Sequence, residues 1–348
     1  MTALVLATGL TVICNNLAKQ LDHQMMAERW SSDGGVSQVS CFFATDAQMT
    51  EGQIQSFEHS LDSALVGASI EVEEGSSARL WVDAYSADGR ITLSTERGTL
   101  DTEALGVGGD FFLFHPLKLI CGSYFSGNDL MQDHVVIDED AAWQLFGSTD
   151  VAGQIVMVGN VPHIVSGVVE RPQGRLEEAA GLDATVVYVS YQTLQELGRS
   201  YGLNHYEIVM PNPVSGFAVK QVQENIGVDE KEMEVVENTS RFSLLSRFKL
   251  IRQFPTRSMN GKAIIYPYWE NLARGYEDII AVYTVLSLIF FAYAGIGILI
   301  CLIKWWKNRR FTAKDIWNMG KDRTERFIEY KRLQRQRQAL AQDEEEKL

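Results

Sequence analysis

The chain has 348 residues, 46% of them hydrophobic, and a formal net charge of −14. This length predicts either two folded units or one unit with membrane anchors. The segment after Ile303 holds 13 Lys and Arg against 8 Asp and Glu, which leaves 18 basic and 37 acidic residues before it. A body with net charge −19 repels phosphates, which argues against non-specific nucleic-acid binding, and its expected partners are proteins or cations.

An uncharged run, Ile279–Ile303, is slightly longer than the ~20 residues that a helix needs to cross a bilayer. We predict a transmembrane helix over residues 279–303. A buried helix of a soluble core is the alternative, but such helices usually carry a polar face. The following segment, Lys304–Arg310, combines two tryptophans with four basic residues, a pattern that stays in the cytoplasm, and the preceding Glu277-Asp278 is acidic. The tail is therefore expected inside the cell and the acidic body outside.

Residues 1–30 are expected to hold a first transmembrane helix and a stalk. Thr2–Cys14 is apolar but covers only about half a span, and no basic region precedes it. Three interpretations stay open: a transmembrane helix that continues through Leu17 or has lost its first turns at the start codon, a cleaved or uncleaved signal, and an interfacial segment. Leu17, Leu21 and Met25 keep helical spacing, which predicts that the helix extends outward as a stalk.

Residues 31–170 are predicted to form a porter-like αβ subdomain. Val36–Ala44 has the composition of a strand, and Thr50 with Gln53 forms the capping-box pattern of a helix start. A further strand is expected near Ser69–Val72. The subdomain thus opens with a strand–helix–strand unit.

A tight hairpin is predicted at Asp88-Gly89, because this dipeptide suits the positive φ angles of a two-residue turn. Its strands would be Leu80–Ser86 and Arg90–Ser94.

A strand, a helix and a second hairpin are expected next along the chain. The helix, Ala141–Phe146, has Asp138 as its N-cap and is halted by Gly147. The strand before it is His134–Ile137, and the hairpin after it joins Gln154–Val158 through Gly159-Asn160 to His163–Val169.

A charged stretch with interspersed Pro and Gly, Arg171–Gly181, predicts a subdomain boundary. Residues 171–265 are predicted as a second αβ subdomain and residues 266–278 as a second stalk. The strand–helix–strand order predicts an α+β extracytoplasmic domain of two small subdomains, inserted between two transmembrane helices, with a cytoplasmic helical tail at residues 304–348. The elements expected in the second subdomain are the strands Thr185–Ser190, Tyr206–Met210 and Met233–Asn238, and the helices Gln192–Leu197 and Phe217–Ile226.

Patterns of catalytic or cofactor sites are absent from the sequence. Without a Gly-x-x-x-x-Gly-Lys-Ser/Thr motif the chain is not expected to hydrolyse ATP, and no cofactor is expected. Its six histidines have no metal-ligand spacing, so no metal site is expected. We interpret Asp138-Glu139-Asp140 as acids at a helix N-terminus rather than as a carboxylate site. Cys41 and Cys121 are expected outside the cytoplasm, where a disulfide between them is chemically permitted.

Patterns between residues 119 and 169 resemble the extracytoplasmic core domain of the MacB/FtsX-like permeases of ABC transporters. In that family a strand, an Ala-x-x-Leu-Phe-Gly helix, an Asp-x-x-Gly turn and a hairpin ending in Gly-Val occur in this order. Here the helix closes with Leu145, Phe146 and Gly147, and the turn holds Gly153. The glycines allow backbone angles that other residues resist, and Leu145 and Phe146 can fill the core. The resemblance implies a MacB-type core domain.

The segment after the span is similar to the family pattern Arg-Arg-x-x-Glu-Ile-x-x-x-Arg-x-x-Gly, a short helix that docks on the ATPase subunit. Asp315 stands where the family usually has Glu, and Met319-Gly320 resembles the closing turn. A basic juxtamembrane helix attracted to anionic lipid is the alternative. The residues to which the resemblance gives an ATPase-coupling role are Arg309, Arg310, Asp315, Ile316, Met319 and Gly320.

One departure from the family is large. Family permeases carry two more membrane helices after this segment, whereas Asp322–Leu348 is charged throughout and cannot form a span. The resemblance therefore implies a partial permease of a bacterial cytoplasmic membrane, with an ABC ATPase, a second membrane permease subunit or fragment, and the lipid bilayer as partners. It would couple the ATPase to the extracytoplasmic domain for export or envelope remodelling. The alternative is a non-transporting binding or sensing module outside the cytoplasm, and an enzymatic role is not expected.

Overall fold

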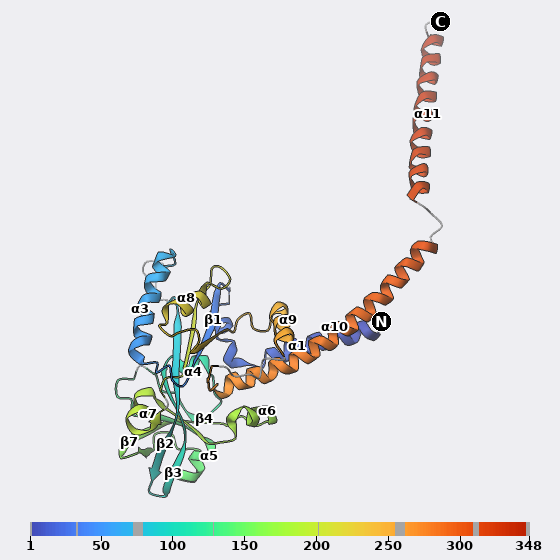
Figure 1. Ribbon diagram of the computed structural model, residues 1–348. Helices are drawn as coiled ribbons and strands as arrows, with labels where there is room; N and C mark the ends of the chain where they lie inside the picture. Colours follow the sequence, from blue (N-terminus) through green and yellow to red (C-terminus); the bar gives the residue numbers. More distant parts are fainter. Residues whose placement is uncertain are drawn as a thin grey trace. The chain divides into compact units, whose positions relative to one another are not determined.

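The computed structural model describes residues 2–345 with gaps at residues 33, 72–78, 128, 201, 255–261 and 309–312, and only the backbone at residues 313–316 and 335–345. Its contacts divide the chain into two units, residues 8–287 and residues 1–7 together with 288–348. The first unit is a mixed αβ domain (Figure 1), in agreement with the predicted α+β class.

One mixed sheet of eleven strands organises residues 8–287. Its order is β11-β1-β10-β2-β3-β8-β5-β7-β4; β6 pairs with β2 and β7, and β9 pairs with β2. The pairs β3–β8 and β5–β7 are parallel, and the other pairs are antiparallel. The strands are β1 (Val36–Phe43), β2 (Val82–Thr95), β3 (Gly98–Gly109), β4 (Leu119–Gly122), β5 (His134–Asp138), β6 (Ile155–Val158), β7 (Val161–Val169), β8 (Val186–Ser190), β9 (Arg199–Ser200), β10 (His205–Pro211) and β11 (Met233–Glu237).

Helices pack on different parts of this sheet. α8 contacts α3, β1 and β11, whereas α5 and α7 contact β2 and β3 (Figure 1). The helices are α1 (Thr2–Ala18), η1 (Asp22–Gln24), α2 (Met26–Trp30), α3 (Glu51–Gly67), α4 (Phe111–Phe114), α5 (Glu139–Phe146), α6 (Arg175–Glu177), η2 (Glu178–Leu182), α7 (Tyr191–Leu197), α8 (Phe217–Asn225), α9 (Leu244–Gln253), α10 (Tyr268–Asn308) and α11 (Ala313–Glu345).

Several local predictions are confirmed. Thr50 and Gln53 form the expected capping box of α3. The Asp138 carboxylate accepts a hydrogen bond from the backbone N–H of Ala141 and so caps α5, which ends at Gly147 with φ of 74°. The hairpin of β6 and β7 turns at Gly159-Asn160. Between residues 185 and 238, β8, α7, β10, α8 and β11 each lie within one residue of the expected ends.

The predicted hairpin turn at Asp88-Gly89 is wrong. β2 runs unbroken through both residues, and the chain turns at Glu96-Arg97, between the paired residues Thr95 and Gly98. Gly89 is needed for space, since a Cβ atom there would meet the carbonyl oxygen of Arg199 at 2.5 Å. A glycine inside a strand often marks such a close backbone approach, and here that packing overrides the turn preference of the dipeptide.

The predicted boundary near residue 170 does not divide the sheet. β1 lies between β10 and β11, and β8 lies between β3 and β5, so strands from both sides of the boundary alternate. β2 connects distant parts of this arrangement, because its first half pairs with β10 and its end pairs with β6. Long-range strand pairing leaves no mark in local composition, which is why the sequence did not indicate it.

Two other expected elements do not form. α1 ends at Ala18, and the short helices η1 and α2 follow it separately, so the continuous first stalk helix is wrong. Ser69–Glu71 is not a strand, because the Ser69 N–H bonds the Val66 carbonyl in a turn; Val72 lies outside the described residues. The segment predicted as the second stalk, residues 266–278, is helical from Tyr268 onward, where α10 starts.

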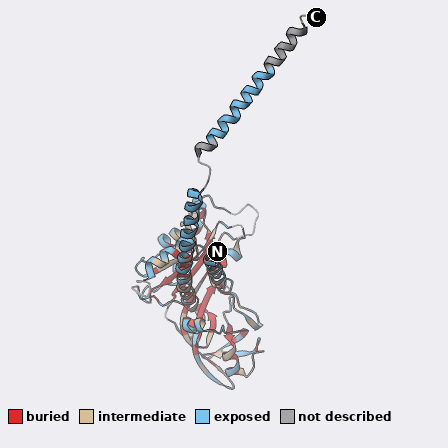
Figure 2. Ribbon diagram, turned by 90° about the vertical axis from the view of Figure 1, so that its right-hand side faces the viewer, coloured by how far each residue is buried: buried red, intermediate tan, exposed pale blue. Residues whose placement is uncertain are grey.

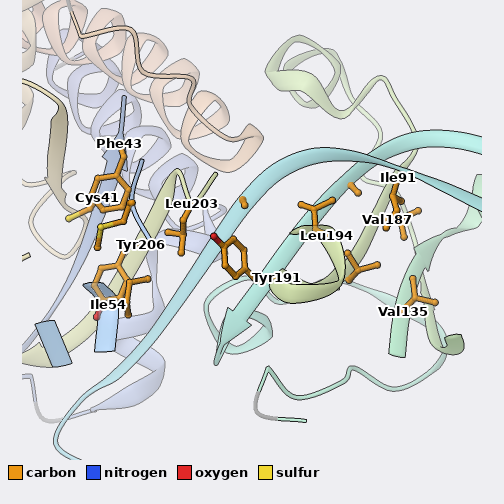
Figure 3. Packing of buried hydrophobic residues seen from close by; sticks show 14 of the residues in the cluster. Cys41, Phe43, Ile54, Ile91, Val135, Val187, Tyr191, Leu194, Leu203 and Tyr206 are labelled. Carbon is orange, nitrogen blue, oxygen red and sulfur yellow. The ribbon is translucent and has the colours of Figure 1, made fainter. Parts of the chain in front are cut away.

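Hydrophobic clusters cover both faces of the sheet, and Figure 2 shows the buried residues in red along the strands. Side chains alternate along a strand, so Val135 and Ile137 join one cluster and Val136 joins the other. Figure 3 shows part of the first cluster, which includes residues of α3, α5, α7 and α8. The second cluster includes Phe114 of α4 and Trp269, the second residue of α10. The beginning of α10 is therefore part of the core.

The predicted span at residues 279–303 lies within α10. Among the described residues, α10 is the helix that is long and apolar enough to cross a membrane. Its side chains at Ile289 and Ile296 are 59% and 60% exposed, as a lipid-facing helix requires. α1 is apolar but has 17 residues. The first transmembrane helix therefore stays a prediction.

Cys41 and Cys121 are both free. They lie on β1 and β4, which are seven strand-to-strand steps apart in the sheet. At about 4.8 Å per step this is on the order of 30 Å, whereas a disulfide joins Cα atoms about 4.4–6.8 Å apart. The structure therefore excludes the disulfide that their compartment would permit.

The role of Gly89 predicts a large difference between two glycine substitutions. G89A should lower the free energy of unfolding by about 1–3 kcal/mol, because the backbone carbonyl of Arg199 cannot yield as a side chain could. G98A should change it by less than ~0.5 kcal/mol, since a Cβ at Gly98 meets nothing within 4 Å. Denaturant unfolding in detergent, followed by tryptophan fluorescence, measures both. Equal effects would contradict this packing.

Candidate functional site

Helix α10 begins inside the sheet domain rather than on its surface. Trp269 and Glu270, in its first turn, are each 1% exposed. Trp269 packs against Phe111, with ring centroids 5.8 Å apart, and against His115, at 4.1 Å. Its carbonyl accepts a hydrogen bond from the Gln24 side chain of η1. The start of the helix is thus held by elements from three distant parts of the sequence.

A buried ion cluster fixes the same turn. The guanidinium of Arg241, which follows β11, donates to both carboxylate oxygens of Glu270 at 2.7 and 2.8 Å. It also donates from Nε to Glu277 at 2.6 Å. Arg274 donates from Nε to Glu270 at 2.7 Å and from its terminal nitrogen to Glu234 of β11 at 2.6 Å. We call Arg241, Arg274, Glu270, Glu277 and Glu234 the stalk clamp.

The stalk clamp resists being opened. The side chain of Arg241 is 4% exposed and that of Glu270 is 1% exposed, so neither charge can be hydrated if its partner leaves. Burial alone would lower the pKa of Arg241, but the carboxylates of Glu270 and Glu277 raise it above its usual value. Removing one member of such a buried pair costs about 3–5 kcal/mol, although an apolar pair of equal volume can be as stable. The clamp therefore favours one placement of α10 on β11.

A second polar group lies around Trp269. His115 Nε2 is 2.6 Å from Glu207 Oε2 of β10, and His115 Nδ1 is 3.1 Å from His23 Nδ1 of η1. Burial lowers the pKa of His23 well below its usual value, and the nearby His115 and Arg29 lower it further. The direction of the hydrogen bond between the two Nδ1 atoms depends on the tautomers of the rings, and His115 Nε2 faces the Glu207 carboxylate at ion-pair distance. This chain of contacts joins η1 to the central strand β10.

Helix α1 contacts both α9 and α10 at the same end of the domain. The Arg247 side chain donates to Asn15 Oδ1 of α1 at 2.9 Å and to the Phe242 carbonyl at 2.9 Å. The thiol of Cys14 lies 3.9 Å from the Ile280 carbonyl of α10, within reach of a weak hydrogen bond. A displacement of α10 would therefore act on α1, α9 and the sheet together.

The predicted fold-motif residues lie at the end of α5 and in the turn before β6. Leu145 is 1% exposed and belongs to the first core cluster, and Phe146 packs partly buried against it. Gly147 has φ of 74°, and its space is limited by the Arg97 guanidinium. Gly153, with φ of 84°, donates its N–H to the Val165 carbonyl. The structure thus gives these residues packing and turn positions.

The predicted ATPase-coupling residues belong to the other unit. Arg309 and Arg310 lie outside the described residues, and the side chains of Asp315 and Ile316 on α11 are not described. Met319 is exposed, and Gly320 lies inside α11, which continues to Glu345. A short helix closed at Met319-Gly320 is therefore wrong: the charged sequence that follows, rich in Glu, Lys, Arg and Gln, favours continued helix.

Sequence reasoning missed the clamp and the Trp269 site. Their residues are spread from His23 to Glu277, and no short motif joins them. One signal was available, because Glu270 and Arg274 are spaced i,i+4 and pair within the stalk helix. Arg241, which completes the clamp, could be assigned only with the fold known.

Among the described residues, one group of side chains of metal-ligand types is formed by Asp129, Asp133 and His134. Their donor atoms all lie within 4.8 Å of one another. His134 Nδ1 is 2.8 Å from Asp129 Oδ2 and 3.1 Å from Asp133 Oδ1. That no metal site is present stays an expectation.

The clamp predicts unequal effects for two arginine substitutions. R241A should lower the free energy of unfolding by about 3–5 kcal/mol, because it leaves Glu270 buried without its main partner. R90A should cost at most ~1 kcal/mol, since its pair with Asp101 is about half exposed. Chemical denaturation in detergent gives both values. If R241A cost no more than R90A, the clamp would not hold α10.

Comparison with known proteins identifies the family. The profile of the MacB-like periplasmic core domain matches residues 3–227. The macrolide export ATP-binding/permease protein MacB of Chromobacterium violaceum is 28% identical over 130 residues, which are 37% of this chain and 19% of that protein. A probable export ATP-binding/permease protein of Pseudomonas fluorescens is 31% identical over 150 residues, which are 42% of this chain and 22% of that protein. The matches thus span about a fifth of these curated relatives.

Solved structures show weaker likeness. The periplasmic region of MacB from Actinobacillus actinomycetemcomitans is 17% identical with a TM-score of 0.41, and the match covers 65% of this chain and 95% of that one. The extracellular domain of the noncanonic ABC-type transporter YknZ from Gram-positive bacteria is 18% identical with a TM-score of 0.37, covering 57% and 99%. TM-scores this low support no inference about function. By the match over residues 3–227, the chain belongs to the family of ABC-type permeases that carry a MacB-like periplasmic core domain.

Proposed function

We propose that this chain is a permease subunit of an ABC-type complex in a bacterial cytoplasmic membrane. Its sheet domain lies outside the cytoplasm and its basic tail inside, as the charges on either side of Ile279–Ile303 favour. Its role is mechanical: it couples ATP hydrolysis by a partner to movement of the sheet domain, for export or envelope remodelling.

The observation that carries the proposal is the continuity of α10. The helix runs without a break from Tyr268 to Asn308, a length of about 60 Å at 1.5 Å per residue. Its first turn is locked into the sheet domain by the stalk clamp, and its apolar part follows directly. A helix that is clamped at one end and unbroken along its length can pass a displacement from one side of a bilayer to the other.

The proposed partners are an ABC ATPase and a second membrane permease subunit. The ATPase would dock near residues 309–320, where the sequence resembles the family's docking segment. The names of the curated relatives combine ATP-binding and permease parts, which supports this context. The second permease subunit is proposed because the described residues hold one helix long and apolar enough to cross a bilayer, and one such helix cannot by itself line a path.

A second candidate function is a binding or sensing module that does not transport. An acidic cavity on the sheet domain, lined by Glu51, Glu58 and Asp83 among others, favours this candidate. The two candidates differ in whether the tail binds an ATPase.

Substitutions on α11 test the docking segment. The double variant D315K/I316A should lose the co-purifying ATPase, because it reverses the charge and removes the apolar side chain that the docking resemblance assigns. T324A, on an exposed position of the same helix, is the matched control and should keep the partner. Affinity purification after mild detergent extraction, with mass spectrometry of the partners, measures the result. Unchanged partners in D315K/I316A would favour the sensing module.

A substitution in the stalk tests force transmission. G275P should uncouple the sheet domain from the ATPase, because proline breaks the helical hydrogen bond to residue 271 and kinks α10. G275A should stay coupled, since a Cβ at Gly275 meets nothing within 4 Å. Limited proteolysis of the purified complex, with and without ATP and vanadate, reports movement of the domain. The nucleotide should alter the fragments of the domain in G275A but not in G275P, and a response in both would contradict the mechanism.

A further inference from the structure

A cavity of about 490 Å³ opens beside helix α3, between that helix and the first residues of β2. Glu51, Glu58 and Asp62 line it from α3, and Asp83 lines it from β2. Asp110, just after β3, completes a set of five carboxylates. The volume is that of a small-molecule site.

Positive charge does not balance these carboxylates. Among the lining residues the one cation is Arg79, which pairs with Asp110 at 2.6 Å. Glu51 and Asp62 accept neutral hydrogen bonds from the Tyr85 hydroxyl and the Trp81 indole N–H, at 2.6 and 2.7 Å. The cavity thus keeps an excess of negative charge beside two aromatic rings.

Asp83 gives the second observation, because it is a buried carboxylate that Arg79, the one cation of the lining, does not pair with. It is 8% exposed, and its Oδ2 has no hydrogen-bond partner of good geometry. Burial, with smaller contributions from the adjacent Glu58 and from Asp110, raises the pKa of Asp83 to about 7, although the Tyr206 hydroxyl of β10 lowers it. Burying a carboxylate without a cation is unfavourable, and a bound cation would relieve it.

We propose that this cavity binds an organic cation, an amine or quaternary ammonium that carries an apolar group. The site goes beyond the coupling function proposed above, because a domain that only transmits force does not need it. Trp81 and Tyr85 also line the cavity and are partly buried, so the parts of their rings that reach it can contact a cation or its apolar group.

A metal ion fits the cavity less well than an organic cation. A divalent ion needs carboxylate oxygens that converge within a few ångströms. Among the described residues, three donor atoms lie that close together at Asp129, Asp133 and His134. None of these residues lines this cavity. Carboxylates spread over a wide cavity suit an extended cation with delocalised contacts.

The state of Asp83 makes binding depend on pH. A cation stabilises the ionised carboxylate, so binding releases the proton that Asp83 carries below pH 7. The ionised fraction of a group with a pKa near 7 rises about tenfold between pH 6 and pH 8, and the affinity should rise by about the same factor. The charges facing Asp83 are Glu58 on α3 and Asp110 after β3, and Tyr206 on β10 faces it with a neutral hydroxyl.

Calorimetry on the full chain in detergent tests the proposal, with benzyltrimethylammonium as the probe because its charge does not change with pH. Binding about tenfold tighter at pH 8 than at pH 6, with N-benzylacetamide, a neutral compound of similar size, failing to bind, would support the site. Equal binding of the neutral compound, or Ca²⁺ displacing the probe at equimolar concentration, would overturn it.

Variants locate the site. D83N should weaken binding at pH 8 at least tenfold and abolish its pH dependence, whereas D101N, at the far end of the β2–β3 hairpin, should bind as the native chain does. D83N should also unfold at a higher temperature at pH 8. The raised pKa means that Asp83 favours folding below its unfolded pKa of about 3.9, and that this contribution is lost as the pH rises through 7.

If D83N does not fold, the variant E58Q provides a second test of the site. It should weaken probe binding and shift the pH midpoint of binding downward, because Glu58 raises the pKa of Asp83. Native affinity in E58Q with an unchanged midpoint would overturn the assignment.

Discussion

A guanidinium buried to 4% exposure must be surrounded by carboxylates, and this requirement of Arg241 governs how the chain is assembled. Glu270 meets it with two hydrogen bonds and Glu277 with a third. Both acids lie on α10, whereas Arg241 follows β11 of the sheet. The start of α10 is therefore fixed on the domain by charge as well as by the packing of Trp269, and few other placements would satisfy both.

This attachment explains why the domain can work with a membrane helix. Both faces of the sheet are buried, and the second hydrophobic cluster includes Trp269 of α10 as well as residues of α2 and α4. His115 and Glu207 extend the attachment to η1 and β10, and Arg247 extends it to α1. Movement of α10 must then move these elements or open a buried charge, which costs several kcal/mol. A joint of this kind suits force transmission better than a flexible linker does.

Local rules predicted much of this fold, and long-range contacts account for what they missed. The caps at Thr50 and Asp138 and the end of α5 at Gly147 depend on neighbouring residues, so the sequence alone indicated them. Asp88-Gly89 satisfies the rule for a turn, but the backbone near Arg199 needs the space and the strand continues. Arg241 and Glu270 are 29 residues apart, so nothing local could predict the clamp.

The central claim is that the base of α10 and the sheet form one cooperative body. Native-state hydrogen exchange tests it most directly, by comparing the amides of residues 272–278 with those of β10 in the same sample. The account predicts that both sets exchange with the same opening free energy, within about 1 kcal/mol. Exchange of the α10 amides through an opening several kcal/mol cheaper, while β10 stays protected, would contradict it.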